Sequence, residues 1–374
     1  MSKQSNDTPS NPAPTTLSGL IAAANFRLRW FDLGRRVREI HTETAEQFEA
    51  GETPWPHPYL RHAWCGLLLW PKADTDGAPV AWFLRLPLDE QGKLLLPVRD
   101  RFLRQLDDAL KPIAGATDQQ NSDPAARLQR ALDDSGLTYT PPDERRAVFH
   151  AKAAQRLKHP PSSHWPAAQK FAEQPDHTAW QHLALQGIAD LAVRWQEVKP
   201  TLVKRTGEYP APFLISLCQC LEGEPVDGTL TRALIRRADT VLTNIDAAPG
   251  DRESLAPADL ALLTAIVRGI SHSTEAHLRQ DFLLKLLESP AAANGEVLAA
   301  IGSRCCDDLL IPELAELWLE NLSESQPQQT FNLLLTDLLF LPQLRNVLLE
   351  TLRNPERSEA IARAFGEFLQ PSGQ

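Results

Sequence analysis

Residues 80–106, VAWFLRLPLDEQGKLLLPVRDRFLRQL, contain a change of hydrophobic period that decides the fold class of the first part of the chain. Before the DEQGK segment, the residues of one parity are all apolar: Trp82, Leu84, Leu86 and Leu88. This alternation is typical of a strand with one buried face. From Pro97 onward, apolar residues recur at helical spacing: Val98, Phe102, Leu103, Leu106 and Leu110. The sequence therefore predicts a strand, a turn and a helix, in that order.

The residues around this stretch complete a small α+β domain over residues 16–112. FRLRWF at 26–31 alternates apolar and basic residues, which predicts a half-buried strand, and TLSGLIAAAN at 16–25 predicts a short helix. AWCGLLLW at 63–70 is apolar at both parities, as in a central strand covered on both faces. The turn-forming segment PKADTDGAP follows it, so residues 63–88 are expected to form an antiparallel hairpin with a long connection.

The rest of the chain predicts helices only. Residues 113–140 have the composition of a linker that holds one helix, and residues 141–374 contain many short, Leu-rich amphipathic helices. The first of these helices is expected to begin at Pro141, with Thr140 as its N-cap. Such a series predicts an all-α domain of stacked helical hairpins, a HEAT-like solenoid. No motif recurs at a constant period, so an irregular helical bundle is the alternative.

The charge balance bears on the kind of partner. The 374 residues include 38 basic and 48 acidic side chains, which gives a formal net charge of −10. Residues 281–341 alone hold ten acidic and two basic side chains. An acidic surface repels a phosphate backbone, so nucleic-acid binding is disfavoured and a basic protein partner is favoured.

The ends and the most apolar segment of the chain predict a cytoplasmic protein with no membrane span. Residues 1–15 are rich in Ser, Asn, Pro and Thr, so they are expected to be disordered, and they lack the apolar run of a signal peptide. FNLLLTDLLFL at 331–341 is too short to cross a bilayer and carries Asp337 in its middle. Five cysteines without regular spacing predict no disulfide framework and fit a reducing compartment.

Motifs that would indicate a cofactor or a catalytic centre are missing from the sequence. It contains no phosphate-binding G-x-x-x-x-G-K-[ST] loop, no G-x-S-x-G elbow and no H-E-x-x-H zinc motif. A zinc site could combine Cys218, Cys220, Cys305 and Cys306. However, residues two apart on a helix project in nearly opposite directions, so Cys218 and Cys220 are interpreted as buried packing thiols. No cofactor, metal ligand or catalytic residue is predicted.

One group of side chains in the α+β domain could support acid–base chemistry: His57, His62, Asp89 and Glu90. The histidines lie in PWPHPYLRHAW, where the prolines indicate an extended loop. Neighbouring carboxylates on an extended chain point to opposite faces, and DEQGK has the composition of a turn. The four residues are therefore interpreted as structural loop positions. His41 is expected at the start of a helix whose Glu43, Glu46 and Glu49 line a solvated face.

A basic stripe lies at the start of the helical half. Arg145, Lys152 and Arg156 fall on one face of the predicted helix, with Arg146 and Lys158 nearby. Such a stripe could contact phosphate or an acidic partner. A solvated helix face is the interpretation that we favour.

The sequence of the first hundred residues resembles that of a known family. FDLGRRV at 31–37, HAWCGLLLW at 62–70 and WFLRLPLDEQG at 82–92, followed by RDRFL, are similar to a bacterial family catalogued as domain of unknown function 3549. The resemblance covers most of the chain, although its distinctive stretches lie in the first hundred residues and the sequence of the helical half is generic. It implies a bacterial cytoplasmic protein and brings with it no activity, cofactor or catalytic residue.

The sequence thus predicts a non-enzymatic adaptor or scaffold for protein–protein interaction. One alternative is an enzyme of unfamiliar type with its site near His57, His62, Asp89 and Glu90. The other is a helical-repeat protein that binds nucleic acid through the basic helix at 145–158.

Overall fold

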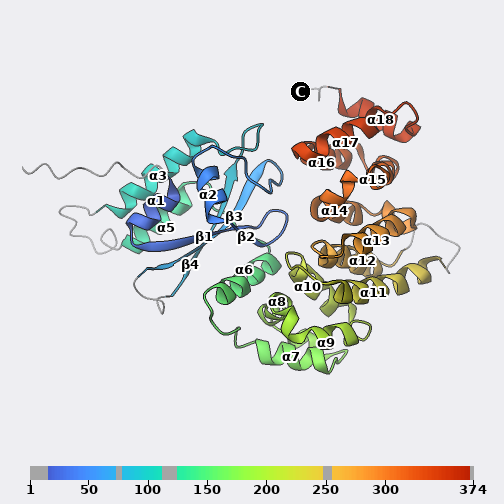
Figure 1. Cartoon of the computed structure of the whole chain (residues 1–374), viewed down its shortest axis with the longest axis horizontal. Coiled ribbons are helices and arrows are strands. Elements are labelled where there is room, and N and C mark those ends of the chain that lie inside the picture. The colour runs from blue at the N-terminus through green and yellow to red at the C-terminus, as the bar shows by residue number, and fades with distance from the viewer. Residues whose placement is uncertain (1–15, 73–77, 112–123, 247–254, 371–374) are drawn as a thin grey trace, which may run out of the picture. The chain divides into compact units, whose positions relative to one another are not determined.

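The computed structural model describes residues 16–72, 78–111, 124–246 and 255–370 (Figure 1). The disorder expected for residues 1–15 lies outside these ranges. Contacts divide the chain into two compact units. The first unit contains the chain up to Phe31, Glu39–Pro56 and His62–Tyr139, and the second contains Asp32–Arg38, His57–Arg61 and Thr140 onward.

The first unit is a four-stranded sheet with helices, which confirms the predicted α+β class. The sheet has the order β2-β1-β3-β4. Its strands are β1 (Phe26–Asp32), β2 (Arg38–Ile40), β3 (His62–Pro71) and β4 (Val80–Pro87). Its helices are α1 (Leu17–Ala23), α2 (Thr42–Glu49), α3 (Leu96–Leu110) and α5 (Pro124–Asp134), the last of which packs on α3.

The hairpin and the change of period are confirmed. β3 pairs antiparallel with β4, from His62 opposite Pro87 to Leu69 opposite Val80. The predicted apolar parity of β4 and the turn is buried throughout: Trp82, Leu84, Leu86 and Leu88. Pro87 ends an edge strand, where its lack of an N–H costs no ladder hydrogen bond. β3 is an inner strand and is buried along most of its length, as predicted.

An aromatic cluster holds α2 against the sheet. The ring of Phe48 lies 4.9 Å from that of Trp55, and Trp30 of β1 contacts both rings at centroid distances of 6.5 and 6.3 Å. His41 stands at the N-cap of α2, as expected. The solvated face predicted for this helix is wrong at Glu49, which is 1% exposed because its carboxylate accepts backbone hydrogen bonds from the first turn of α1.

From Thr140 onward, the second unit contains helices and loops in the ranges that the structure describes. Its α-helices are α6 (Asp143–Arg156), α7 (Trp165–Glu173), α8 (Leu185–Val193), α9 (Trp195–Arg205), α10 (Ala211–Leu221), α11 (Gly228–Asp246), α12 (Pro257–Ile270), α13 (Ala276–Glu288), α14 (Gly295–Arg304), α15 (Pro312–Ser325), α16 (Gln328–Leu339), α17 (Pro342–Arg353) and α18 (Glu359–Phe368). Short 3-10 helices lie at η1 (Ala179–His182), η2 (Pro290–Ala293) and η3 (Cys306–Leu310).

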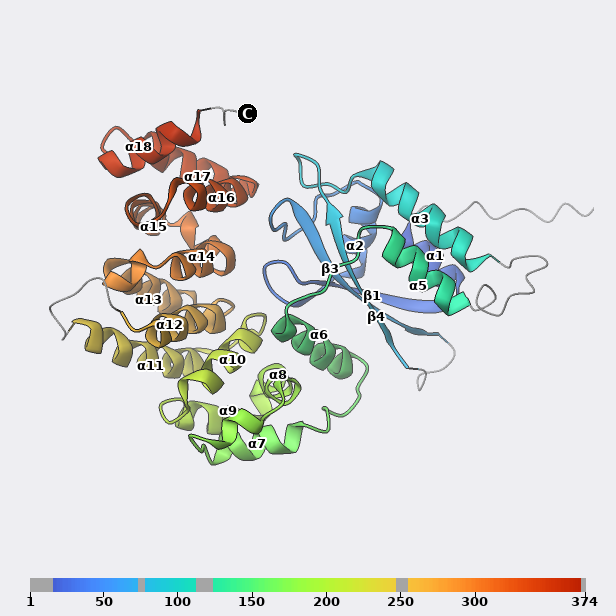
Figure 2. The same cartoon turned by 180° about the vertical axis from the view of Figure 1, so that it is seen from behind.

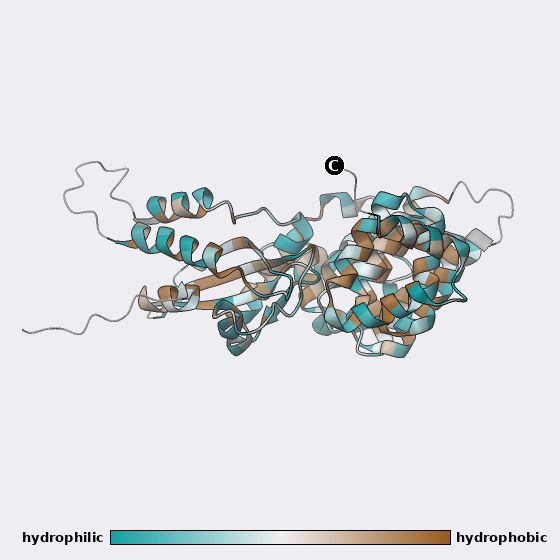
Figure 3. Ribbon diagram, turned by 90° about the horizontal axis from the view of Figure 1, so that it is seen from above, coloured by the Kyte–Doolittle hydropathy of each residue, from teal (hydrophilic) through white to brown (hydrophobic). Residues whose placement is uncertain are grey.

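These helices alternate between two layers (Figures 1 and 2). One layer runs through α6, α8, α10, α12, α14 and α16, each packed on the next. The other runs through α7, α9, α11, α13, α15 and α17. Many of these helices carry apolar residues on one side and polar residues on the other (Figure 3), which is how an amphipathic helix buries one face.

The predicted start of α6 is wrong by two residues. The helix begins at Asp143 and its N-cap is Pro142, so neither Thr140 nor Pro141 has the role expected of it. The cause is the tandem of prolines, since a residue that precedes a proline is driven out of the helical region. Pro141 therefore lies outside the helix, which starts only after Pro142.

Candidate functional site: a buried arginine–carboxylate cluster

Two short segments from the N-terminal part of the sequence belong to the helical unit. They are Asp32–Arg38 and His57–Arg61. The first segment is shaped by its own aspartate, because Asp32 accepts hydrogen bonds from the backbone N–H groups of Gly34 at 3.2 Å and Arg36 at 3.5 Å. It delivers Arg35 and Arg36 to the helices of the second unit.

Arg35 forms a buried ion pair with α16. Its Nη2 lies 2.9 Å from Oδ2 of Asp337, and the two side chains are 5% and 6% exposed. Oδ1 of Asp337 accepts the backbone N–H of Leu60 at 2.7 Å, and Nε of Arg35 donates to the carbonyl of Pro58 at 2.8 Å. Burial acts to lower the pKa of Arg35, but Asp337 raises it above its ordinary value. Both segments are therefore fixed to one carboxylate.

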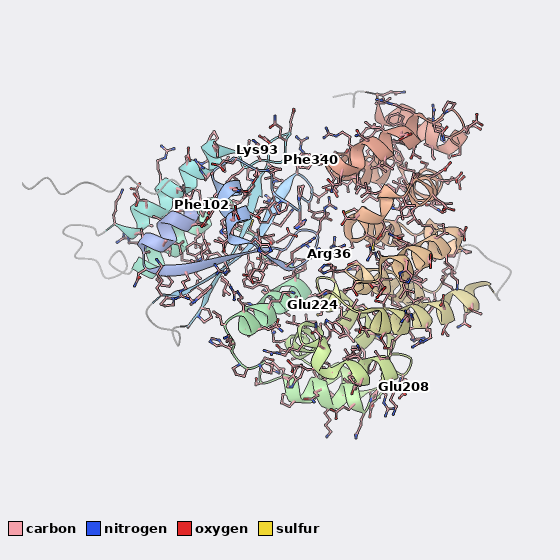
Figure 4. All side chains as sticks on the ribbon, viewed as in Figure 1. Arg36, Lys93, Phe102, Glu208, Glu224 and Phe340 are labelled. Atoms are coloured by element: carbon pink, nitrogen blue, oxygen red, sulfur yellow. The ribbon has the colours of Figure 1, made fainter. Side chains whose placement is uncertain are left out.

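Aromatic rings add to the attachment of the His57–Arg61 segment. The Tyr59 ring lies 5.5 Å from the guanidinium carbon of Arg35 and 5.8 Å from that of Arg304. Arg61 lies 5.4 Å from the ring of Phe340, at the C-cap of α16 (Figure 4). Contacts of a cation with an aromatic face are attractive, and more so when they are desolvated.

Arg35 and Arg36 also bind the C-terminal ends of two helices. Arg36 Nη2 donates to the carbonyl of Ser271, the C-cap of α12, at 2.9 Å, and to the carbonyl of Arg304, the last residue of α14 (Figure 4). Arg35 Nη1 lies 3.4 Å from the carbonyl of Ser303. The last carbonyls of a helix have no partner within it, and the helix dipole makes this end negative. Arginine satisfies both requirements, so the segment caps α12 and α14.

Glu222, just after α10, is the centre of the second part of the cluster. Its two oxygens lie 2.6 Å from Nε of Arg304 and 2.7 Å from Nε of Arg268, and Arg145 Nη2 lies at 3.7 Å. Burial alone would raise the pKa of Glu222, but the three arginines lower it to about 2. The carboxylate is thus ionised at neutral pH and is shared by α6, α12 and α14.

Gly223 allows the segment Asp32–Arg38, called the inserted segment below, to approach the helices closely. A Cβ at this position would lie 2.3 Å from the carbonyl oxygen of Val37, so only glycine allows the approach. The carbonyl of Gly223 also lies 3.0 Å from Nδ1 of His272. Burial, Arg38 and Arg36 lower the pKa of His57 to about 3. The pKa of His272 is lowered as well, so the imidazoles of His57 and His272 are both neutral at pH 7 and lie near Arg36 and Arg38.

The basic stripe predicted on α6 is largely used inside the unit. Arg145 donates to the carbonyl of Leu33 and pairs with Glu222, and Lys152 pairs with Glu224. Their side chains are only 13% and 16% exposed, so the solvated-face interpretation is wrong for both residues. It holds for Arg146, which pairs with exposed Asp143 at 2.7 Å, and for Arg156, which is exposed.

The loop residues singled out as possible acid–base groups do not form one group within either unit. Asp89 and Glu90 occupy a turn in which Oδ1 of Asp89 accepts from the N–H groups of Gln91 at 2.8 Å and Lys93 at 2.9 Å. Gly92 has a φ of 78°, as the composition suggested, and Glu90 is exposed. His62 begins β3 in the same unit, whereas His57 belongs to the second unit.

The cysteines are buried in the way that packing thiols are. All five cysteines are buried, and none of them forms a disulfide. Burial raises the pKa of Cys218 and of Cys305 to about 12, and raises the pKa of Cys220 and Cys306 as well. A thiol that stays protonated is a poor nucleophile and a poor metal ligand. Among the described residues, no group of His, Cys, Asp or Glu side chains is arranged to hold a metal ion.

The residues at the centre of the cluster are ones that sequence reasoning missed. The available signal was a charged residue in apolar surroundings: Asp337 in FNLLLTDLLFL and Glu222 after FLISLCQCL. A charge in such a place requires a partner. The partners are far away in sequence, however, since Arg35 and Asp337 are separated by 302 positions.

Comparisons with known proteins agree with the resemblance noted above. The model of a family described as "Protein of unknown function (DUF3549)" matches residues 14–369. Searches of curated proteins and of solved structures gave no match. In the part of the chain that the structure describes, no helix is both long enough and apolar enough to cross a membrane.

Proposed function

The chain belongs to the DUF3549 family, and on the geometry above we propose that it is a non-enzymatic scaffold or adaptor that binds a basic protein partner. We place it in the bacterial cytoplasm, as the family resemblance implies. The single observation that carries the proposal is an acidic stripe on α15.

The α15 acidic stripe consists of Glu313, Glu316, Glu320 and Glu324. Spacings of three, four and four residues place these side chains on one face of the helix. Three of them are exposed and Glu320 is half-buried, while the opposite face, which includes Trp318, is buried. None of the four forms an ion pair within the described ranges. Unpaired, exposed acids in a row are free to attract a cationic surface.

A groove adjoins the stripe. Its volume is about 550 Å³, and its lining includes Pro312 and Glu316 of α15 together with Val347 and Glu350 of α17. The groove combines apolar residues with two glutamates and one arginine, Arg353, so acidic side chains outnumber basic ones where an extended or helical basic segment of another protein would lie. The stripe thus has a neighbouring concave surface in which such a partner could be anchored.

The two-layer order of the helices also supports a scaffold. Stacked helical hairpins present extended surfaces on which partners bind, and we propose that this unit is a HEAT-like repeat array of that kind. Fold alone does not determine function, so the argument rests on the α15 acidic stripe.

The other two candidate functions receive less support from the geometry. Arg145 and Lys152 are committed to buried carboxylates, which removes two of the three residues of the basic stripe from contact with nucleic acid. Asp89 is occupied by backbone N–H groups of its own turn, which leaves it poorly placed to act as an acid or base.

Charge reversal on α15 tests the proposal. We expect the tagged full-length protein to retain a specific partner in affinity purification from its host, and E320K/E324K to lose that partner. These two positions are chosen because lysine in the C-terminal half of a helix agrees with the helix dipole. The matched control is D133K/D134K, which makes the same change of net charge on the exposed end of α5.

Binding of the purified partner to the protein is then measured at increasing salt concentrations, since an electrostatic contact weakens as ionic strength rises. Equal retention of the partner by E320K/E324K and by wild type would contradict the assignment of α15. Recovery of no partner above background under several growth conditions would contradict the scaffold itself.

A further inference from the structure

Arg38 is a cation without a partner in the second unit. Its side chain is half-buried, its Nε is shielded from solvent with no hydrogen-bond acceptor, and it forms no ion pair within the residues that the structure describes. Burial and Arg36 lower its pKa, while Asp32 and Asp307 offset part of that effect. A buried charge of this kind is costly unless something neutralises it.

Arg36, two residues earlier, is only 7% exposed and has a second unsatisfied donor. Its Nη2 donates to the carbonyls that end α12 and α14, but its Nε is buried and has no acceptor among the described residues. A donor that is buried and unsatisfied costs on the order of 1–3 kcal/mol, so native proteins rarely retain one without a reason.

Contacts of the backbone bring four basic side chains close to one another: Arg36, Arg38, His57 and His272. Val37, between the two arginines, packs its carbonyl against Gly223, and the carbonyl of Gly223 binds His272. Arg36 itself binds the carbonyl of Ser271, the residue before His272. The adjacent Arg35 binds the carbonyl of Pro58, the residue after His57. Arg36, Arg38, His57 and His272 therefore converge, as their mutual electrostatic influence also indicates.

Most of the nearby carboxylates are already committed to other groups, and Asp307 forms no ion pair with Arg38 within the described residues. Glu222 is shared by three arginines, Asp337 binds Arg35 and Glu224 binds Lys152. Asp32 uses its carboxylate on backbone N–H groups of its own segment. Three arginines on one glutamate already leave a positive surplus, and Arg36 and Arg38 increase it.

We propose that Arg36, Arg38, His57 and His272 form a binding site for a phosphoryl group. The guanidinium forks of the two arginines suit phosphate oxygens, and the free Nε2 of His272 can donate a hydrogen bond once the ring is protonated. A doubly charged anion matches a site with more than one uncompensated cation. This site is independent of the α15 acidic stripe, so it adds a small-molecule ligand to the proposed scaffold.

Calorimetric titration of the full-length protein with inorganic phosphate at constant ionic strength tests the site, with sodium chloride as the reference. We expect saturable binding to wild type, and an affinity lower by on the order of tenfold to a hundredfold in R38Q, because a hydrogen bond to a charged group is lost. R236Q, which changes an exposed arginine of α11 with no ion pair among the described residues, should bind like wild type. Glycerol 3-phosphate is titrated in parallel; tighter binding than inorganic phosphate assigns the site to a phosphomonoester, and equal binding assigns it to free phosphate.

Absence of saturable phosphate binding to folded wild type would overturn the proposal, as would equal binding by R38Q. Should R38Q fail to fold, R38K and H272Q take its place, because R38K keeps the charge and loses only the fork. Unchanged phosphate affinity in both of these variants would also overturn it. Phosphate stabilises many proteins by being excluded from their surface, so a thermal shift common to wild type and R38Q counts against the site.

Discussion

The two units of this protein bury charge at opposite ends of their helices. In the first unit, the carboxylate of Glu49 accepts the backbone N–H groups of Leu17 at 2.7 Å and Ser18 at 3.2 Å, at the start of α1. In the second unit, Arg35 and Arg36 donate to carbonyls at the ends of α12 and α14. Each buried charge has the sign that the polarity of its helix end requires.

The carboxylates of Glu49 and Glu222 differ in how far neighbouring groups neutralise their negative charge. The Glu49 carboxylate is held by backbone groups and one serine, and burial raises its pKa above the ordinary value. Glu222 is held by arginines, which lower its pKa to about 2 in spite of complete burial. The negative charge of Glu49 is therefore less completely neutralised than that of Glu222.

The largest expected effect is the loss of the Glu222 carboxylate. We expect Glu222→Gln to lower the free energy of unfolding by about 3–5 kcal/mol, because it leaves buried arginines without their counter-charge. Urea denaturation followed by circular dichroism measures the change. A loss below about 1 kcal/mol would show that Arg145, Arg268 and Arg304 are not held by this residue.

A smaller effect is expected where the inserted segment meets the helices. Gly223→Ala should destabilise the protein by about 1–3 kcal/mol, since the added methyl would collide with the Val37 carbonyl. Gly366→Ala in α18 is the matched control, because a Cβ there meets no atom within 4 Å. That control should stabilise the protein by about 0.5–1 kcal/mol through helix propensity. Equal effects of the two changes would contradict the close approach.

The two carboxylates should respond to pH with opposite signs. The pKa of Glu222 is lowered, so its stabilisation is present above pH 4.5 and is lost as the pH falls toward 2. The pKa of Glu49 is raised, so stability is lost as the pH rises from 4.5 through the folded-state value.

Urea denaturation at a series of pH values measures this contrast. The stability difference between wild type and Glu222→Gln should narrow as the pH falls below 4.5. The free energy of unfolding of Glu49→Gln should instead increase relative to that of wild type as the pH rises above 4.5. The same direction of change in both variants would remove the distinction between the two units.

The smallest effect is expected at an exposed ion pair of the helical unit. Lys285 Nζ lies 2.6 Å from Oδ1 of Asp239, and the two side chains are 52% and 38% exposed. Solvent and salt screen such a pair, so Asp239→Asn should cost less than about 1 kcal/mol. A cost equal to that of Glu222→Gln would mean that burial is not what makes the cluster important.

Much of the fold could be predicted from hydrophobic period alone. Alternation up to Leu88 and helical spacing after Pro97 correctly predicted β4 and α3, because each element buries one face and its period follows from geometry. Local rules failed where two of them competed. The start of α6 is one example, because the constraint of Pro142 on Pro141 prevailed over the capping pattern at Thr140.

The cluster could not be predicted in the same way. Period indicates which face of an element is buried, but it does not reveal which distant residue will neutralise a charge there. Glu49 follows the spacing of a solvated face and is nevertheless buried, because α1 starts next to it. Similarly, the arginines in FDLGRRV were informative as a family resemblance, while their partners became visible only in three dimensions.

The central claim is that the inserted segment and α16 form one buried charge network, and a double-mutant cycle tests it most directly. Arg35→Met, Asp337→Asn and the double variant are compared with wild type by urea denaturation. We predict that the two changes are coupled by at least about 1 kcal/mol, because each single variant strands the partner of the residue it removes. Effects that add to within about 0.3–0.5 kcal/mol would contradict the network.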